Sequence, residues 1–207
     1  MLLVLAFILS YLLGSIPSGV WVGQALYHKD VRTAGSHNIG TTNVYRVLGP
    51  VAGTIVLVMD ILKGTLGASL PVLFGYQHHW LVLVCGVAAV IGHTASIFIG
   101  FKGGKAVATS AGILLAYNPG FFLIASALFV SFILLTSMVS IASTSAITIV
   151  TIISWFGYHD PLLTAIAGIL AVVFFIRHRA NFARIRRGQE NLVPFGLYYW
   201  YRQRHQS

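Results

Sequence analysis

The first 26 residues read MLLVLAFILSYLLGSIPSGVWVGQAL and contain no charged side chain. A helix of this length is long enough to cross the roughly 30 Å hydrocarbon core of a bilayer. The stretch has no positively charged start, and its apolar character continues past Gly14, so it differs from a cleavable signal peptide. Pro17 predicts a kink, and small residues from Gly14 to Gly23 predict close packing against another helix. We expect a spanning helix that starts outside the cell.

The composition of the whole chain indicates an integral membrane protein. Of the 207 residues, 57% are hydrophobic and 8% are charged, and the mean hydropathy is +0.85. A soluble domain carries roughly three times that charged fraction. No polar run is long enough for a second domain, so residues 1–207 are expected to form a single membrane domain with a basic cytoplasmic tail at about 182–207. The net charge of +9 sits in short clusters beside apolar segments, which favours membrane lipids or a phosphorylated substrate over nucleic acid.

The apolar segments predict an all-α, polytopic membrane protein with a bundle of seven transmembrane helices. Their expected ranges are about 2–26, 51–74, 80–98, 106–117, 121–135, 141–156 and 162–176. With the amino terminus outside and the carboxyl terminus in the cytoplasm, none of the 13 Lys and Arg residues falls in an outer turn. All of them except Lys63 lie in inner loops or in the tail, as the positive-inside rule requires. We therefore expect a multi-pass protein of the cell (inner) membrane with its active site at the cytoplasmic face.

One of these expected spans is shorter than the hydrocarbon core of the bilayer is thick. Residues 106–117 would form about 18 Å of helix, against a core of about 30 Å. If this helix crosses the bilayer, the glycine-containing loop before it must be drawn into the membrane and supported there by protein.

The polar stretch RTAGSHNIGTTNVYR at residues 32–46 is the first candidate for a binding loop. It contains no carboxylate, and it offers backbone N–H groups, hydroxyls, amides and guanidinium groups. Such a surface of donors suits an oxyanion, above all a phosphate. The candidate residues in this stretch are Ser36, Asn38, Thr41, Thr42, Asn43 and Arg46.

Two further basic stretches are expected to join that loop in one cytoplasmic pocket. FKGGKAVAT at residues 101–109 has glycines that expose backbone N–H groups, lysine charge, and a helix start directly after them. It is not a Walker A loop, because Ile99 and Ala106 stand where that pattern requires Gly and Ser or Thr. RHRAN at residues 177–181 ends the last expected span, and the four-residue spacing of Arg177 and Asn181 predicts that they share a helix face. The alternative interpretations are positive-inside flanking for the first stretch and a lipid-headgroup anchor for the second.

The later arginines Arg184, Arg186 and Arg187 are assigned to that lipid-headgroup anchor. Glu190 is the only acid in the tail, and it is expected to fix one of the arginines.

Ionisable residues inside the expected spans are the remaining candidates. Asp60 and Lys63 are three residues apart on one helix and are expected to pair, and His93 lies near the end of another span. Such groups usually face a bundle interior or a wet cavity. No ligand spacing indicates a metal site, and no Gly-x-Ser-x-Gly motif indicates a serine nucleophile.

Taken together, these stretches resemble the bacterial acyl-phosphate-dependent glycerol-3-phosphate acyltransferases of the PlsY type. The matching residues are GSIPSG at 14–19, the stretches at 32–46, 101–109 and 177–181, DILKG at 60–64, GH at 92–93, and Gly188 with Glu190. The sequence departs from the family where His37 replaces a usual glycine and Ala180 a common glutamate. The tail after Glu190 is also longer than expected.

The resemblance implies a seven-helix enzyme that needs no cofactor or metal. It would transfer an acyl group from acyl phosphate to the 1-hydroxyl of sn-glycerol 3-phosphate, making lysophosphatidic acid and inorganic phosphate in the first step of phospholipid synthesis. The catalytic residues implied are Ser36, Arg46, Lys105, His178 and Asn181. The substrate-binding residues expected are Asn38, Thr41, Thr42, Asn43, Asp60, Lys63, His93, Lys102, Gly103, Gly104, Ser140, Arg179 and Glu190.

The mechanism leaves the general base open between His178 and a substrate phosphate oxygen. An acyl phosphate is a mixed anhydride with a good leaving group, so it needs charge stabilisation and positioning more than a strong base. The rival hypotheses are a small anion transporter, which needs polar groups reaching both faces, and a non-enzymatic scaffold with lipid-anchoring loops.

Overall fold

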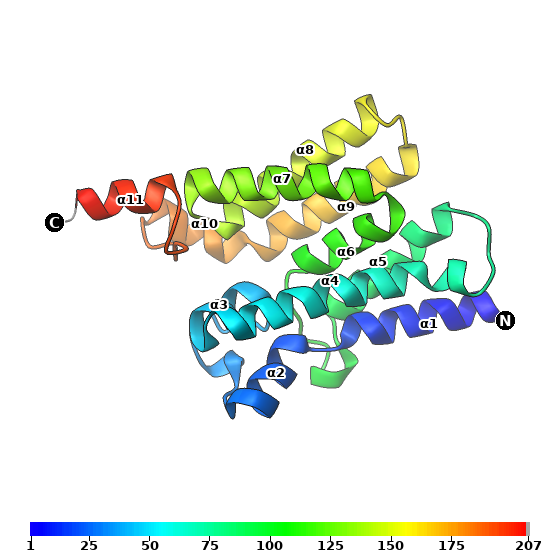
Figure 1. Cartoon of the computed structure of the whole chain (residues 1–207), viewed down its shortest axis with the longest axis horizontal. Coiled ribbons are helices and arrows are strands. Elements are labelled where there is room, and N and C mark those ends of the chain that lie inside the picture. Colours follow the sequence, from blue (N-terminus) through cyan, green and yellow to red (C-terminus); the bar gives the residue numbers. More distant parts are fainter. Residues whose placement is uncertain (206–207) are drawn as a thin grey trace. The chain divides into compact units, whose positions relative to one another are not determined.

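The computed structural model describes residues 1–205, and the all-α fold expected from the sequence is confirmed for them. Besides α-helices and two short 3-10 turns, this part of the chain has only an isolated bridge between Ser96 and Lys102. The chain divides into two compact units, Met1–Gly120 and Phe121–Ser207, whose helices are labelled in Figure 1. The single domain expected from the sequence stays a prediction.

The first unit is organised around one long helix, α4, which contacts every other α-helix of the unit. The helices are α1 (Leu2–Ser15), α2 (Ser18–Tyr27), α3 (Thr41–Leu48), α4 (Pro50–Leu73), α5 (Trp80–Thr94) and α6 (Val107–Tyr117), with 3-10 turns at Val31–Thr33 and Ile97–Ile99. Glycines allow the closest approaches: a Cβ at Gly14 would collide with the carbonyl of Ala89 in α5, and one at Gly64 with that of Thr109 in α6. The close helix packing predicted for the first apolar segment is therefore confirmed.

The kink predicted at Pro17 is a complete break. The pair α1 and α2 is bent by 47° there, because proline lacks the N–H that an uninterrupted helix needs and its ring displaces the preceding turn. The carbonyl of Ile16, left without a helical partner, accepts a hydrogen bond of 2.8 Å from Lys63 Nζ of α4. The break is thus held by a side chain from another helix.

The third expected span, residues 80–98, is shorter in the structure, because α5 ends at Thr94. The chain then turns so that the backbone N–H of Ser96 donates to the carbonyl of Lys102 and the N–H of Phe101 donates to the carbonyl of Ser96. The Ser96 hydroxyl also donates to the carbonyl of Ser15. These tertiary hydrogen bonds replace those of a continuing helix, although the apolar composition of the expected span up to residue 98 is typical of a helix.

The second unit contains α7 (Pro119–Thr136), apart from its first two residues, and α8 (Val139–Phe156), α9 (Pro161–Arg177), α10 (Arg179–Arg186) and α11 (Leu197–Arg204). Helices α8 and α9 pack against each other as a hairpin (Figure 1). Asp160 begins α9 by accepting a hydrogen bond of 2.9 Å from the N–H of Leu163, and Ser154 and Thr164 join the two helices at 2.8 Å. The break expected between the segments 141–156 and 162–176 is therefore confirmed, and Pro161 is already the first residue of α9.

Each of the seven expected spans corresponds to a helix or to a bent pair of helices. Three helices, α4, α7 and α8, are long and apolar enough to cross a membrane on their own, and up to five crossings result if each bent pair is one span. The shorter apolar helices α5 and α6 correspond to the other two segments. The number of crossings and the orientation of the termini stay predictions.

Candidate functional site

The polar loop before α3 is shaped by the buried amide of Asn43. Its Oδ1 accepts from the N–H of Ser36 at 2.8 Å, and its Nδ2 donates to the carbonyls of Val31 and Asn38 at 2.8 Å each. Asn43 therefore fixes the path of the loop, and any contact it makes with a substrate comes in addition to that. His37 has φ 57°, the left-handed region that glycine tolerates best, and this explains why a glycine would suit that position.

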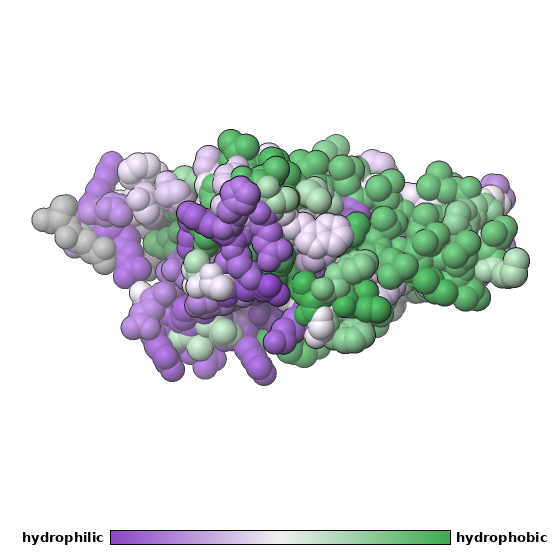
Figure 2. Space-filling view, turned by 90° about the horizontal axis from the view of Figure 1, so that it is seen from below, coloured by the Kyte–Doolittle hydropathy of each residue, from purple (hydrophilic) through white to green (hydrophobic). Residues whose placement is uncertain are grey.

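The other candidates on this loop remain accessible. The side chains of Ser36, Asn38, Thr41 and Thr42 are half-buried and Arg46 on α3 is exposed. Asn38 Oδ1 accepts from the N–H of Gly40 at 2.9 Å, which positions the start of α3. In Figure 2 hydrophilic residues gather over the part of the first unit that holds α2 and α3, and hydrophobic residues cover α1.

Arg32 does not add free positive charge to this loop. Its guanidinium is paired with Asp30 at 2.7 Å, and its side-chain hydrogen bonds hold the pKa of the Asp30 carboxyl below its ordinary value. The expectation that Arg32 is one of the donors of this stretch is therefore wrong, because its acid partner Asp30 lies two residues earlier in the chain.

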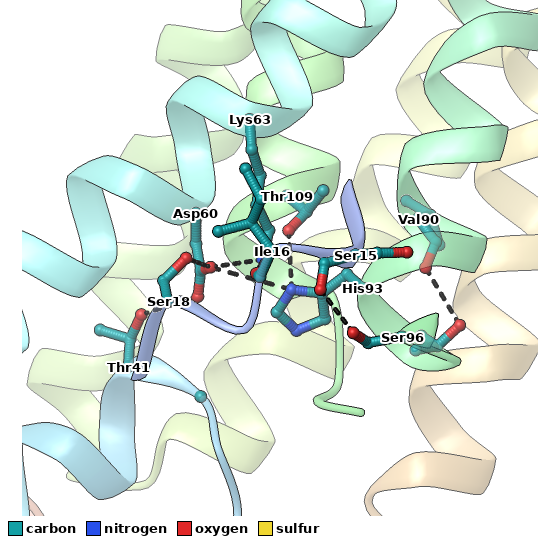
Figure 3. Close-up of polar contacts among 12 residues, drawn as sticks. Ser15, Ile16, Ser18, Thr41, Asp60, Lys63, Val90, His93, Ser96 and Thr109 are labelled. Atoms are coloured by element: carbon teal, nitrogen blue, oxygen red, sulfur yellow. Dashed lines mark hydrogen bonds and ion pairs between the residues drawn. The ribbon is translucent and has the colours of Figure 1, made fainter. Parts of the chain in front are cut away.

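A buried carboxylate connects the break in the first apolar segment with three other helices (Figure 3). Asp60 Oδ1 accepts from Ser18 Oγ at 2.9 Å and pairs with Lys63 Nζ at 2.8 Å. His93 Nδ1 lies 3.9 Å from the same oxygen and 3.1 Å from Thr109 Oγ1 of α6. The pairing of Asp60 with Lys63 predicted from their spacing is confirmed, and both side chains are only 4% exposed.

The glycine loop at 101–106 rests on His93. The N–H of Gly104 donates to the His93 carbonyl at 3.1 Å, and a Cβ at Gly104 would collide with the ring atom Nε2 of that histidine. A Cβ at Gly103 would likewise collide with the His93 carbonyl. Lys102 is exposed and Lys105 is half-buried, directly before the start of α6.

The structure therefore brings two of the three predicted stretches into one network within the first unit. The loop ending in α3 approaches Asp60 through Thr41, whose hydroxyl lies 3.5 Å from Oδ2. The glycine loop reaches the same carboxylate through His93. Asp60, Lys63 and His93 support these two loops from the buried side. The contact with substrate predicted for these three residues stays a prediction.

The candidates from the carboxyl-terminal part gather in the second unit. His178 is 2% exposed; its Nδ1 lies 2.8 Å from the carbonyl of Phe174, and its Nε2 lies 3.4 Å from Ser143 Oγ. A carbonyl only accepts, so Nδ1 carries a proton and Nε2 holds the lone pair in the neutral ring. The sequence did not indicate Ser143 as a candidate, because a single serine in a helix rich in Ser and Thr cannot be distinguished from its neighbours.

Glu190 ties the neighbouring candidates together. It accepts from Asn181 Nδ2 at 2.6 Å and from Ser140 Oγ at 3.4 Å, and it pairs with Arg184 Nε at 2.9 Å. The expectation that Glu190 fixes one of the arginines is confirmed. Arg179 is exposed.

Two details of this part of the chain correct the sequence analysis. Arg177 ends α9 and Asn181 lies in α10, and the two helices are bent by 54°, so these residues do not share the face of one continuous helix. Arg184, assigned to a lipid anchor together with Arg186 and Arg187, is the partner of Glu190.

An apolar groove with a volume of about 390 Å³ lies between the helices of the second unit. Its lining includes Phe132, Ile149, Phe175 and Phe182, from α7, α8, α9 and α10 respectively.

The comparisons with known proteins agree on one family. The family model described as glycerol-3-phosphate acyltransferase matches residues 4–188. The chain belongs to the glycerol-3-phosphate acyltransferase family. The relative of that name from Lacticaseibacillus casei is 66% identical over 204 residues, covering 98% of both chains. The one from Latilactobacillus sakei is 63% identical, covering 99% of this chain and 98% of its own.

Solved structures of PlsY, an integral membrane glycerol 3-phosphate acyltransferase, have the same fold. Its glycerol 3-phosphate form matches with a TM-score of 0.85 and 34% identity, covering 92% of this chain and 95% of that one. Its lysophosphatidic acid form matches with a TM-score of 0.80 and 32% identity. This member of the glycerol-3-phosphate acyltransferase family is therefore a multi-pass membrane acyltransferase of phospholipid synthesis, and the segment from 189 onward lies outside the match to the family model.

Proposed function

We propose that this acyltransferase transfers an acyl group from an acyl phosphate to the 1-hydroxyl of sn-glycerol 3-phosphate, at the cytoplasmic face of the cell (inner) membrane. The products are lysophosphatidic acid and inorganic phosphate. The glycerol-3-phosphate acyltransferases similar to this chain and the glycerol 3-phosphate form of PlsY support the acceptor, and the lysophosphatidic acid form of PlsY is consistent with the product. The acyl-phosphate donor is what the resemblance of the sequence to the PlsY type implies, and the chemistry of the site supports it.

The carboxylates carry this inference. All four have structural partners: Asp30 pairs with Arg32, Asp60 with Lys63 and Glu190 with Arg184, and Asp160 caps α9. The stretches at 32–46 and 101–109 contain none. A site of hydrogen-bond donors whose carboxylates are already paired suits two phosphorylated substrates. It also suits an acyl donor with a good leaving group, because no carboxylate is available as a general base for transfer from a less reactive acyl donor.

In the proposed reaction the loops divide the work. The glycine loop with Lys102 and Lys105 binds the phosphate of the donor, and Ser36, Asn38, Arg46 and Asn181 bind glycerol 3-phosphate, with Thr41, Thr42, Ser140 and Arg179 beside them. The groove of about 390 Å³ is apolar and suits part of the acyl chain.

The chemical step is an attack of the 1-hydroxyl on the acyl carbonyl carbon. A bond forms between the hydroxyl oxygen and that carbon, and the bond from the carbon to the phosphate oxygen breaks. Lys105, Arg46 and backbone N–H groups stabilise the charge that develops on the carbonyl oxygen and on the leaving phosphate. The hydroxyl proton passes to His178 Nε2, whose 3.4 Å contact with Ser143 is long enough for a substrate hydroxyl to replace.

The donor assignment predicts that purified protein in proteoliposomes makes lysophosphatidic acid from palmitoyl phosphate and glycerol 3-phosphate. One inorganic phosphate should be released for each product, and palmitoyl thioester should give no product. The measurement is product formation from labelled glycerol 3-phosphate together with phosphate release. Equal turnover of the thioester would overturn the acyl-phosphate donor while leaving the acyltransferase, and uptake of phosphate without product would indicate a transporter.

The role of His178 predicts that His178→Ala lowers kcat by about 10²-fold with little change in KM, as removal of a general base does. Because this ring is buried, thermal unfolding in detergent is measured in parallel. Ser143→Ala, which removes only the hydroxyl beside Nε2, is the matched variant and should retain most activity. Near-full turnover of His178→Ala would instead assign the proton to a phosphate oxygen of the substrate.

A further inference from the structure

The last described helix has an exposed ridge of large side chains that the reaction does not use. In α11 and just before it, Phe195 is 44% exposed, Leu197 66%, Trp200 58% and Tyr201 61%. In an α-helix, residues three and four apart share a face, so Leu197, Trp200 and Tyr201 form one continuous ridge, hereafter the tail ridge. Arg204, three residues after Tyr201, extends it with a positive charge.

The structure fixes where this ridge lies within the second unit. Ser137, between α7 and α8, is fully buried and anchors the tail: its carbonyl accepts from the N–H of Val193 at 2.9 Å, and its hydroxyl accepts from the N–H of Tyr199 at 3.0 Å. Gly196, with φ 97°, approaches so closely that a Cβ there would lie 2.6 Å from Ser137 Oγ. The tail is therefore docked at the junction of α7 and α8.

That junction defines the surroundings of α11. Both α7 and α8 are long and apolar enough to cross a membrane, so the residues that join them lie at a membrane surface. A helix of eight residues is about 12 Å long and cannot cross the bilayer. Tyr and Trp favour the boundary between headgroups and acyl chains, where their apolar rings and polar atoms are both satisfied.

The positive charge around the tail ridge indicates which kind of surface the ridge binds. From Arg177 to His205 the chain contains seven arginines and one acid, Glu190, which is paired with Arg184. Arg186 and Arg187 are exposed, and Arg202 donates to the carbonyl of Gly188 at 3.2 Å, which ties α11 to the end of α10. A basic helix with an aromatic ridge is complementary to a surface of anionic headgroups.

We propose that α11 docks on the anionic surface of the protein's own membrane. Leu197, Trp200 and Tyr201 insert at the headgroup boundary, and Arg204, with the exposed Arg186 and Arg187, binds lipid phosphates. The tail ridge lies outside the match to the family model, which ends at residue 188, and the proposed docking does not depend on the acyl transfer proposed above. The docked tail follows directly after Glu190, whose carboxylate accepts hydrogen bonds from Asn181 and Ser140.

The test uses the full chain with a single tryptophan. Of its four tryptophans, Trp21, Trp80 and Trp155 are replaced by Phe, and the protein is reconstituted into phosphatidylcholine vesicles with or without phosphatidylglycerol. Lipids brominated near the headgroup should quench Trp200 severalfold more strongly when phosphatidylglycerol is present, and added salt should reduce this difference. The matched control retains only Trp155, which lies near the end of α8 and should be quenched equally in both lipids.

A second variant separates charge from packing. Arg204→Gln in the Trp200 protein should remove most of the dependence on phosphatidylglycerol, and Gln203→Ala, on the same helix, should retain it. Emission of Trp200 typical of water, without quenching by brominated lipid, would overturn the proposal. So would quenching that does not depend on phosphatidylglycerol, or a Trp200 signal that follows the ratio of protein to lipid, since the latter indicates a second copy of the chain on the ridge.

Discussion

Lys105→Met is expected to lower kcat/KM for palmitoyl phosphate by about 10²–10³-fold, the usual cost of removing one group that stabilises transition-state charge. Lys105 is half-buried at the end of the glycine loop, directly before α6. Methionine keeps much of the length and the apolar part of the side chain, so the change removes mainly the charge. The measurement is steady-state kinetics in proteoliposomes with both substrates varied.

The matched control lies on the same loop. Lys102 is exposed, and Lys102→Met should cost much less, because its charge is screened by solvent and lies at the edge of the proposed phosphate site. Thermal unfolding of both variants should be close to that of the parent protein. If Lys105→Met and Lys102→Met have the same small effect, the lysines only flank a membrane segment and the proposed donor site is wrong.

This comparison also tests whether the two lysines have different roles in this acyltransferase. If both lysines only anchored the loop to lipid, they would be interchangeable, because a headgroup binds either of them. In the proposed donor site they are not interchangeable, since the glycines hold one particular backbone path. Gly104 lies against the His93 ring with no space for a side chain, so the loop that carries Lys105 has a position fixed by packing.

Those parts of the fold that depend on local rules could be predicted from the sequence. Pro17 predicted the break between α1 and α2, and the three-residue spacing predicted the Asp60–Lys63 pair. Helices that owe their existence to tertiary contacts could not be predicted. The amphipathic helix α3 lies within a stretch that is rich in turn-forming residues, and α11 is held by Ser137, about sixty residues away in the sequence.

The candidate site shows the same division. Residue types predicted which side chains are donors, but not whether each faces a substrate or the protein. Asn43 and Asn38 look equivalent in the sequence, yet Asn43 is buried with both its amide oxygen and its amide nitrogen bonded to the loop backbone. Asn38 is half-buried, and its Oδ1 accepts from the N–H of Gly40. Ser143 and Ser18 became recognisable only through their distances to His178 and Asp60. Long-range contacts of this kind have no signature in a single sequence.

The largest expected effect on stability comes from the buried ion pair. Lys63→Met leaves the Asp60 carboxylate, only 4% exposed, without its cation, and Asp60→Asn leaves the lysine ammonium without its counterion. Breaking one partner of a buried pair costs about 3–5 kcal/mol. The exposed residue Lys29 provides the control: Lys29→Met makes the same chemical change in the same unit and should shift the unfolding free energy by less than about 0.5 kcal/mol.

The double variant Asp60→Asn/Lys63→Met separates the charge from the packing. With neither charge buried, most of the loss should be recovered, because the desolvation of two ions is no longer required. A remainder of about 1–3 kcal/mol is expected, since the Ile16 carbonyl at the break loses its hydrogen bond from Lys63 Nζ and retains only the one from the N–H of Ser18. The coupling energy comes from denaturant unfolding of all four proteins in detergent, and additive losses would show that Asp60 and Lys63 act separately.

The double variant is expected to recover stability but not activity. Lys63 Nζ fixes the break after α1, and Asp60 fixes Ser18 directly beyond that break. Both residues therefore determine where α2 leads into the polar loop.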